Sequence, residues 1–472
     1  MKNFKLYTAV VALAMCSMSA SAQSLRSGYF LEGYTFRHEI NPAFGLDKNY
    51  VSLPALGNLN IGTTGNVGLG SFLFPYGPNG KLTTFMNGSI GADQFLGNLK
   101  DNNRINANIN LTLLSAGFKA WGGYNTLSIG VRSRTNMNLP YELFEFMKLG
   151  QTSANTVYNI NDLGINSQTY AEIALGHSRQ LTDKLRVGAK MKFLLGGAYA
   201  DVKVDQLSVA MGEEKWLVQA NGEMNAALKG LIMPTKKESG KEITAASQED
   251  LLDWDGIDVD GPGLSGFGMA FDFGASYKLM DNLTLSASLN DLGFIKFSNN
   301  IKARTANKAW EFDGFHDIAV DSELGDDDPM SLNSQLDKIG DDLEDFASFH
   351  RESVGGKVGS ALAATLNVGA EYEMPFYRKL SVGFLSTTAV RGKYTWSEGR
   401  LSANVAPTKW FEAGVNGAVS SFGSSWGWIV NFHPKGFNFF LGMDQVVGKV
   451  SKQFIPINNM NMNVSLGMNV AF

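Results

Sequence analysis

The end of the chain, MNMNVSLGMNVAF from Met460 to Phe472, is the clearest guide to the fold. Every second residue in it is apolar, and the residues between are small or polar. Successive side chains of a β-strand point to opposite faces, so the segment predicts a strand with one apolar and one polar face. The same spacing on a helix would put apolar groups on every side, which excludes an amphipathic helix. Seven apolar repeats are long for an edge strand of a soluble sheet, and they suffice to cross a bilayer.

The same alternation recurs along the chain and predicts an all-β fold. With the terminal segment, the alternating segments number fourteen. The others lie at 53–61, 105–113, 127–131, 171–175, 185–195, 267–275, 283–289, 366–372, 380–384, 401–405, 411–419, 426–432 and 437–443.

The lengths of the connections distinguish a barrel from a soluble sandwich. Every second connection is short, namely those near 119–123, 180–184, 279–282, 375–379, 407–409 and 433–436. The remaining connections include all the long ones, at 62–104, 135–167, 196–266, 296–360, 391–399, 421–425 and 445–459. Short turns at one end and long loops at the other are typical of outer-membrane barrels. We therefore predict a transmembrane antiparallel β-barrel of about 14 strands over residues 50–472, with its turns in the periplasm.

Two of the long connections predict short helices. Residues 140–149 place Leu143, Phe144 and Met147 on one helical face, with a proline in the first turn. Residues 332–346 repeat an apolar spacing of three and four. We expect such loop helices to cap the mouth of the barrel; binding a partner is the alternative.

Other loop segments are a predicted hairpin and two acidic clusters. Residues 198–228 predict an extra β-hairpin that extends beyond the membrane. Acidic residues gather at 249–260 and 317–328, but the first cluster does not match the ligand spacing of an EF-hand. We interpret both clusters as solvated loops that divalent ions could bridge to surface glycolipid.

The N-terminus predicts export. Lys2 and Lys5 precede a short apolar run, and an A-x-A site follows at 20–22. We therefore predict a cleaved signal peptide over residues 1–22 and a location in the outer membrane. A lipoprotein signal with Cys16 as its acceptor is the alternative, although the residue before this cysteine is larger than such signals carry.

Composition and motif searches exclude several classes of function. Removal of residues 1–22 removes the only cysteine and two lysines, which changes the formal charge from −5 to 38 − 45 = −7. The mature chain then has no disulfide or thiolate, and no basic stripe suggests nucleic acid. His177 and Ser178 resemble a catalytic pair only in sequence, since adjacent strand residues point to opposite faces. We expect no enzyme, no metal site and no cofactor.

Residues 23–49 precede the first strand and contain Asn41-Pro42-Ala43-Phe44. Proline fixes its own φ and disfavours helix in the residue before it, so Asn41 is expected to open a tight turn. On physical grounds alone, this region is an ordered N-terminal segment.

Charged residues at alternate positions of the predicted strands would face the lumen. They are Arg132, Arg134, Glu172, Arg186, Lys190, Lys192, Asp272, Glu371 and Glu373. These charges can pair with one another and with the N-terminal segment, which is the interpretation we favour. Alternatively, they form the wall of a solute path and set its selectivity.

Two motifs carry a resemblance to known families. Asn41-Pro42-Ala43 near the mature N-terminus resembles fatty-acid-transport (FadL-type) barrels, whose corresponding segment folds into the lumen as a plug. The terminal strand resembles those of bacterial outer-membrane barrels, and this implies that Phe472 is read by the barrel-assembly machinery. With the signal peptide and the strand number, these features resemble a Bacteroidota family of outer-membrane barrels of unknown function, related distantly to FadL-type transporters and to the PorV barrel of type IX secretion.

The resemblance implies two alternative functions. In the first, the barrel passes a hydrophobic or amphipathic small molecule passively, with residues 23–49 as the plug. In the second, it does not transport and serves as a surface or secretion-associated interaction platform through its long loops.

Overall fold

The computed structural model describes residues 25–54, 56–76, 81–152, 156–212, 215–243, 246–305, 309–312, 349–446 and 461–472. The predicted signal peptide, the predicted helix at 332–346 and the acidic cluster at 317–328 therefore lie outside the described residues.

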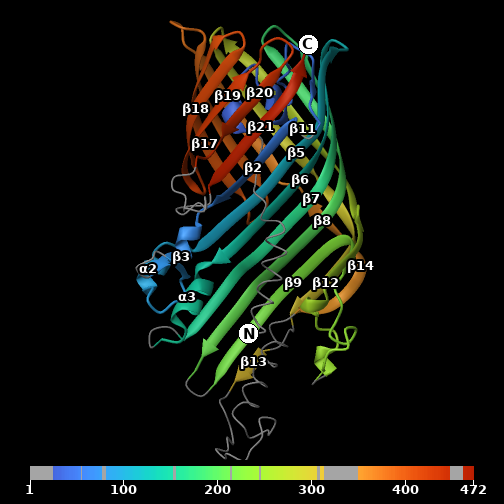
Figure 1. Cartoon of the computed structure of the whole chain (residues 1–472), viewed down its shortest axis with the longest axis vertical. Coiled ribbons are helices and arrows are strands. Elements are labelled where there is room, and N and C mark those ends of the chain that lie inside the picture. Colours follow the sequence, from blue (N-terminus) through green and yellow to red (C-terminus); the bar gives the residue numbers. More distant parts are fainter. Residues whose placement is uncertain are drawn as a thin grey trace, which may run out of the picture.

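Fourteen antiparallel strands close into a barrel, as the sequence predicts (Figure 1). The last strand pairs with the first, with Tyr50 opposite Ala471 and Leu59 opposite Leu466. In order, the wall consists of β1 (Tyr50–Ser52) with β2 (Asn58–Gly65), β5 (Asn102–Ala120), β6 (Gly123–Pro140), β7 (Val157–Gln180), β8 (Leu185–Met211), β11 (Gly266–Met280), β12 (Leu283–Thr305), β14 (Phe349–Ala361) with β15 (Ala364–Glu373), β16 (Leu380–Val390), β17 (Trp396–Thr408), β18 (Phe411–Ser420), β19 (Gly423–Phe432), β20 (Asn438–Met443) and β21 (Met462–Ala471).

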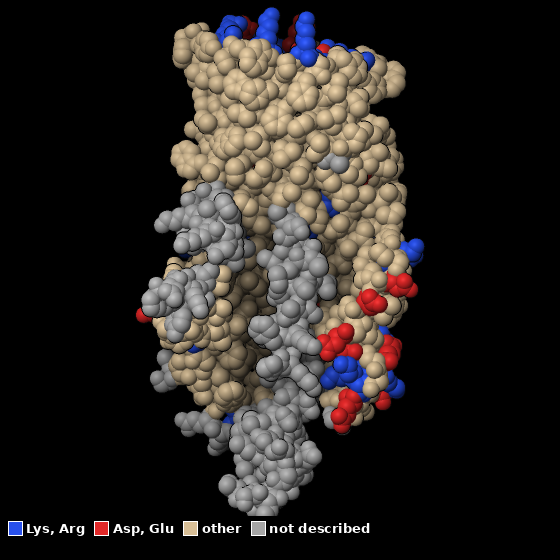
Figure 2. All heavy atoms as spheres, in the orientation of Figure 1, with Lys and Arg blue, Asp and Glu red and all other residues tan. Residues whose placement is uncertain are grey.

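Alternation along each strand separates the two faces of the wall. In β21, Asn463, Ser465 and Asn469 are buried on the inside, whereas Val464 and Val470 are exposed on the outside. On the visible face, an uncharged band separates Lys and Arg side chains at the end with the short turns from charges of both signs beside β12 and β14 (Figure 2). We call these the turn end and the loop end of the barrel.

The first wall strand is interrupted, which corrects the strand predicted at 53–61. Ser52 and Leu59 are seven positions apart, while their partners Asn469 and Leu466 on β21 are only three positions apart. Residues 53–57 therefore leave the ladder as an excursion between β1 and β2. Pro54 explains the break, since proline cannot donate to the ladder.

Several strands are much longer than predicted. β7 has 24 residues, β8 has 27 and β12 has 23, although about 10 suffice to cross a bilayer. The connections predicted at 135–167 and 196–266 are therefore largely strand. Alternation fades there because a wall beyond the bilayer has water on both faces. The predicted hairpin is confirmed: β9 (Trp216–Ile232) returns along β8 and then pairs with β12, β10 (Asp258–Gly263) and β13 (Ala309–Phe312).

Small elements pack at the loop end, and no helix in the described ranges combines the length and apolarity that a membrane span requires. α3 (Tyr141–Leu149) confirms the predicted helix, although Met147 is 39% exposed and Phe146 packs near Tyr158 instead. Phe144 joins a cluster with residues of α2 (Ala92–Leu96), beside a hairpin of β3 (Leu73–Tyr76) and β4 (Lys81–Thr84).

Residues 25–49 cross the lumen from the loop end to the turn end. The backbone N–H of Ser27 donates to Asp444 beyond β20, and the N–H of Asn49 donates to the carbonyl of Phe472. Two short 3-10 helices, η1 (Arg26–Gly28) and η2 (Thr35–Glu39), form within this lumen segment. Tyr29, Tyr34 and Phe36 have no exposed surface. Inward-facing glycines of the wall make room for the aromatic rings of the lumen segment; for example, a Cβ at Gly383 would collide with the ring of Phe30.

Candidate functional site

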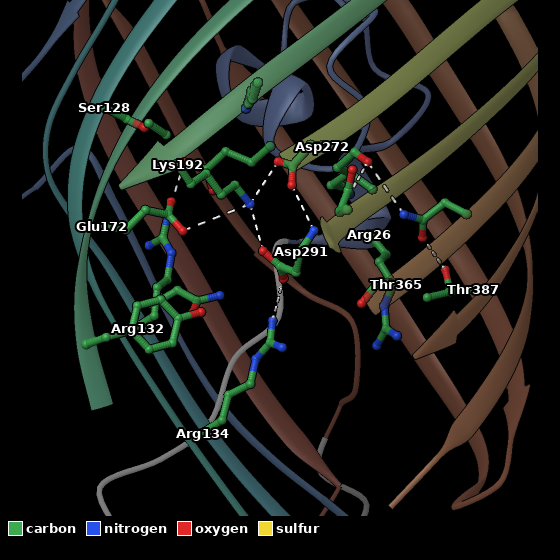
Figure 3. Close-up of a pocket in the computed structure, with 18 residues that line it drawn as sticks. Arg26, Ser128, Arg132, Arg134, Glu172, Lys192, Asp272, Asp291, Thr365 and Thr387 are labelled. Carbon is green, nitrogen blue, oxygen red and sulfur yellow. Dashed lines mark hydrogen bonds and ion pairs between the residues drawn. The ribbon is translucent and has the colours of Figure 1, made fainter. Parts of the chain in front are cut away.

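Charged side chains from five wall strands and the lumen segment surround a cavity of about 70 Å³ in the middle of the barrel (Figure 3). Arg26 of the lumen segment lines the cavity and pairs with Glu398 and Asp444. The other charges are the cations Arg132 and Arg134 on β6 and Lys190 and Lys192 on β8, and the anions Glu172 on β7, Asp272 on β11, Asp291 on β12 and Glu39 on η2. We call these residues the central network. Six of its residues were predicted as lumen-facing, and they come together here.

Lys192 is the centre of this network. Its Nζ lies 2.8 Å from Asp272 Oδ2, 2.7 Å from Asp291 Oδ1 and 3.9 Å from Glu172 Oε2. Only 9% of the Lys192 side chain is exposed. A buried charge without a partner is costly, so the three carboxylates hold the ammonium in the lumen and are held by it.

Asp291 was missed in the sequence because a β-bulge reverses its direction. Its φ is 59°, and the pairing between β11 and β12 shifts by one residue at this point. Outward apolar residues accordingly change from odd positions such as Leu285 to even positions such as Leu292 and Phe294. Asp291 therefore turns inward, where its N–H donates to Asp272 and Arg134 Nη2 lies 3.1 Å from its carboxylate. The shift of parity in the sequence is the signal that could have identified it.

The lumen segment supplies two further groups. Glu39 Oε1 lies 3.8 Å from Arg132 Nη2, which also lies 3.4 Å from Glu172 Oε1. His38 Nδ1 lies 2.9 Å from Lys190 Nζ. Since the ammonium can only donate, His38 Nδ1 accepts, and its Nε2–H donates to the Tyr50 hydroxyl at 2.8 Å. Burial and the Lys190 ammonium hold the pKa of His38 well below its usual range, so the imidazole is neutral.

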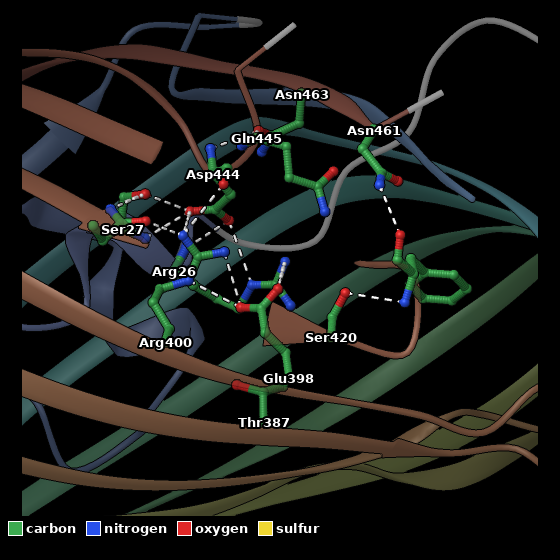
Figure 4. A network of polar contacts seen from close by, with 12 residues as sticks. Arg26, Ser27, Thr387, Glu398, Arg400, Ser420, Asp444, Gln445, Asn461 and Asn463 are labelled. Atoms are coloured by element: carbon green, nitrogen blue, oxygen red, sulfur yellow. Dashed lines mark hydrogen bonds and ion pairs between the residues drawn. The ribbon is translucent and has the colours of Figure 1, made fainter. Parts of the chain in front are cut away.

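A second network holds the start of the lumen segment at the loop end (Figure 4). Asp444 accepts the N–H groups of Arg26 and Ser27 at 3.0 and 2.7 Å. Arg26 also lies 3.3 Å from Glu398, which pairs with Arg400 at 2.9 Å. These residues fall in strand ends and a short segment whose sequence shows no alternation, so sequence reasoning did not single them out.

The remaining predicted charges do not join the central network. Arg186, Glu371 and Glu373 line a separate cavity of about 320 Å³, which we call the turn-end cavity. Its wall also includes Arg37, Phe44 and Gly45 of the lumen segment.

Asn41 is fully buried among the wall strands. Its Nδ2 donates to the carbonyls of Ala275 and Ala287 at 3.3 Å each, and its Oδ1 accepts the N–H of Ala43 at 2.9 Å. Pro42 and Ala43 lie against Gly188. Phe472 is 71% exposed at the turn end. Its role as an assembly signal stays a prediction, and so does the role of residues 41–44 as a plug.

Comparisons with solved structures find distant likenesses. The toluene transporter TbuX of Ralstonia pickettii is 10% identical, with 91% of each chain covered and a TM-score of 0.38. The toluene transporter TodX of P. putida is 10% identical, with 96% of this chain and 94% of that chain covered and a TM-score of 0.39. A FadL homologue of Pseudomonas aeruginosa is 10% identical, with 96% and 98% covered and a TM-score of 0.37.

No curated protein matches the sequence. The family model of DUF5723, described as a family of unknown function, matches residues 42–444. This range includes every strand of the wall except the last, together with the central network apart from Glu39. The chain therefore belongs to the DUF5723 family.

Proposed function

We propose that this protein is an outer-membrane barrel that passes small amphipathic molecules, with residues 25–49 as a plug that controls the path. A closed wall satisfies its own backbone hydrogen bonds, and an uncharged outer band between charged ends suits a bilayer. Exposed aromatic side chains at the turn end, such as Trp121, Phe376 and Trp410, suit the interface between lipid and water.

The observation that carries this proposal is that polar groups are left unsatisfied between plug and wall. Asn110, Asn290 and Asn431 each have a buried Oδ1 without a hydrogen-bond partner in the described part of the chain. Buried amides normally have partners, so ordered water is expected at these positions. A hydrated contact between plug and wall can be rearranged at lower cost than a dry, close-packed core.

The cavities favour an amphipathic solute. The turn-end cavity combines the rings of Phe30 and Phe44 with charged groups, and the central cavity is lined mainly by polar groups. A solute with an apolar part and a polar part could use both. The alternative of an interaction platform depends on the loop at 296–360, most of which lies outside the described residues, and it stays a hypothesis.

Flux through proteoliposomes tests the proposal with two solutes of equal charge. Wild-type protein should pass p-toluenesulfonate faster than methanesulfonate, because its aromatic ring is a much larger apolar part than a single methyl group. Gly383→Leu should raise the flux of both by about tenfold or more, since the new side chain displaces Phe30 and with it the plug.

The matched control is Gly359→Leu. Gly359 is an exposed strand glycine with open space around it, so its substitution should leave flux unchanged. Equal or faster flux of methanesulfonate through the wild type would contradict the amphipathic preference. Unchanged flux in both Gly383→Leu and a deletion of residues 25–47 would contradict a plug.

A further inference from the structure

The turn-end cavity contains charges of both signs that do not meet. Arg37 of the lumen segment and Arg186 of β8 line one side, and Glu371 and Glu373 of β15 with Glu32 line the other. Lys184, Lys278, Asp47 and Asp183 also line this cavity. Lys278 pairs with Asp281, and Asp47 with Lys119. By contrast, no ion pair in the described ranges includes Arg37, Arg186, Glu32, Glu371 or Glu373. This arrangement is unusual, since charges in a partly enclosed site are normally paired.

The two arginines are held side by side by the backbone of the lumen segment. The Cζ of Arg37 lies 4.1 Å from the ring centroid of Phe44, and the Arg186 guanidinium lies over the next residue, Gly45, where a Cβ would collide with it. The Nε atom of each arginine is buried, so the N–H donors that can face the cavity are those on the Nη atoms. Two adjacent guanidinium groups with free N–H donors form a fork that fits a carboxylate.

The anionic side consists of carboxylates that also have unused hydrogen-bonding capacity. Glu371 accepts one hydrogen bond, from Ser381 at 2.8 Å, and keeps free acceptor capacity. Glu32, Glu371 and Glu373 all line the turn-end cavity and a neighbouring hollow of about 130 Å³, so three carboxylates converge there. An ammonium group placed between them would relieve their repulsion.

We propose that the turn-end cavity binds a zwitterionic small molecule, an amino acid or a short peptide. The carboxylate of the ligand lies on Arg37 and Arg186, and its ammonium lies on Glu371 and Glu373. A simple anion would satisfy one side and meet repulsion from the other; a zwitterion satisfies both. The cavity volume of about 320 Å³ falls at the lower end of ligand sites, at roughly 300–1,000 Å³. Binding in the turn-end cavity requires no flux, so it would be a property of the protein separate from transport.

Calorimetric titration of the full-length, detergent-solubilised protein with glycine, diglycine and triglycine tests the proposal. The tightest of the three is then compared with its N-acetyl form, which lacks the ammonium, and its C-terminal amide, which lacks the carboxylate. Each capped form should bind the wild type at least about tenfold more weakly, because each loses a hydrogen-bonded charge. This comparison needs no variant and therefore does not depend on the folding of one.

Variants assign the two ends of the ligand. In Arg37→Gln/Arg186→Gln, the difference between the free peptide and its amide should disappear. In Glu371→Gln, the difference between the free peptide and its N-acetyl form should shrink. The control is Arg179→Gln. Arg179 is an exposed arginine near the end of β7, opposite Val187 of β8, and does not line the cavity, so this variant should bind as the wild type does.

Three outcomes would overturn the proposal. One is that none of the three ligands binds in the millimolar range. Another is that the N-acetyl form binds as tightly as the free peptide, which would leave an anion site. The last is that Arg179→Gln weakens binding as much as Arg37→Gln/Arg186→Gln. Flux through proteoliposomes does not depend on any of these three results. If the zwitterion does not bind, the proposed transport can still be tested by the flux measurements.

Discussion

The central network and the turn-end cavity use similar residues in opposite ways. In the centre, Lys192 has three carboxylates within 3.9 Å. At the turn end, Arg186 lies on the same strand and on the same inward face, yet within the described ranges its guanidinium forms one hydrogen bond, to the Ser178 hydroxyl at 3.3 Å, and no ion pair. Opposite charges that meet hold a structure together, whereas opposite charges held apart can bind something between them. The difference between the two regions therefore distinguishes an ion-pair network that stabilises the fold from a binding site.

The largest effect is expected from Lys192→Met. Removing the ammonium leaves Asp272 and Asp291 buried without their main counter-charge, which should cost about 3–5 kcal/mol of unfolding free energy. Denaturant unfolding in detergent micelles, followed by the mobility of the folded form on gels, measures it. The matched control Lys278→Met removes a 48% exposed ammonium beside Asp281 and should change stability by less than about 0.5 kcal/mol. A similar effect of both substitutions would contradict a structural role for the central network.

The fold could be predicted from the sequence because one constraint acts on nearly every residue of the wall. A strand between lipid and lumen must alternate, so positions such as Val464 and Asn463 reveal their faces directly. The constraint ends where the strand leaves the bilayer, which is why the start of β7 was predicted too late and the end of β8 too early. It also fails at local irregularities: Pro54 interrupts the first strand, and the bulge at Asp291 turns an outward position inward.

The site could be predicted only in part, because inward direction does not specify a partner. Alternation identified Lys192 and Arg186 equally, but nothing in their spacing separates a paired charge from an unpaired one. That difference depends on residues far away in the sequence, such as Asp291, Phe44 and Gly45. Contacts of the lumen segment, for example Ser27 with Asp444, follow no periodic rule and need the folded structure.

A smaller effect is expected from His38→Gln, and it should depend on pH. The pKa of His38 is lowered in the folded protein, whereas in the unfolded chain it has its ordinary value of about 6.5. As the pH falls below about 6.5, the unfolded chain therefore binds more protons at this residue than the folded protein does. The folded state should therefore lose about 1.4 kcal/mol between pH 7.5 and pH 5.5 through this residue. Glutamine keeps a donor for Tyr50 and does not titrate. Unfolding of both proteins across this range should give a steeper loss for the wild type; parallel curves would show that Lys190 and burial do not control this imidazole.

The smallest effect on stability is expected from Arg186→Gln, which tests directly whether Arg186 differs from Lys192 in its contribution to the fold. Arg186 and Lys192 lie six residues apart on β8 and face the same lumen, so their backbone setting is alike. Removing Arg186 breaks no ion pair in the described ranges and relieves repulsion from the neighbouring Arg37, so stability should change by less than about 0.5 kcal/mol, or rise slightly. The same unfolding assay as for Lys192→Met measures it. A loss of unfolding free energy comparable to that of Lys192→Met would mean that Arg186 holds the lumen segment in place, because only the removal of a paired charge lowers stability by that much.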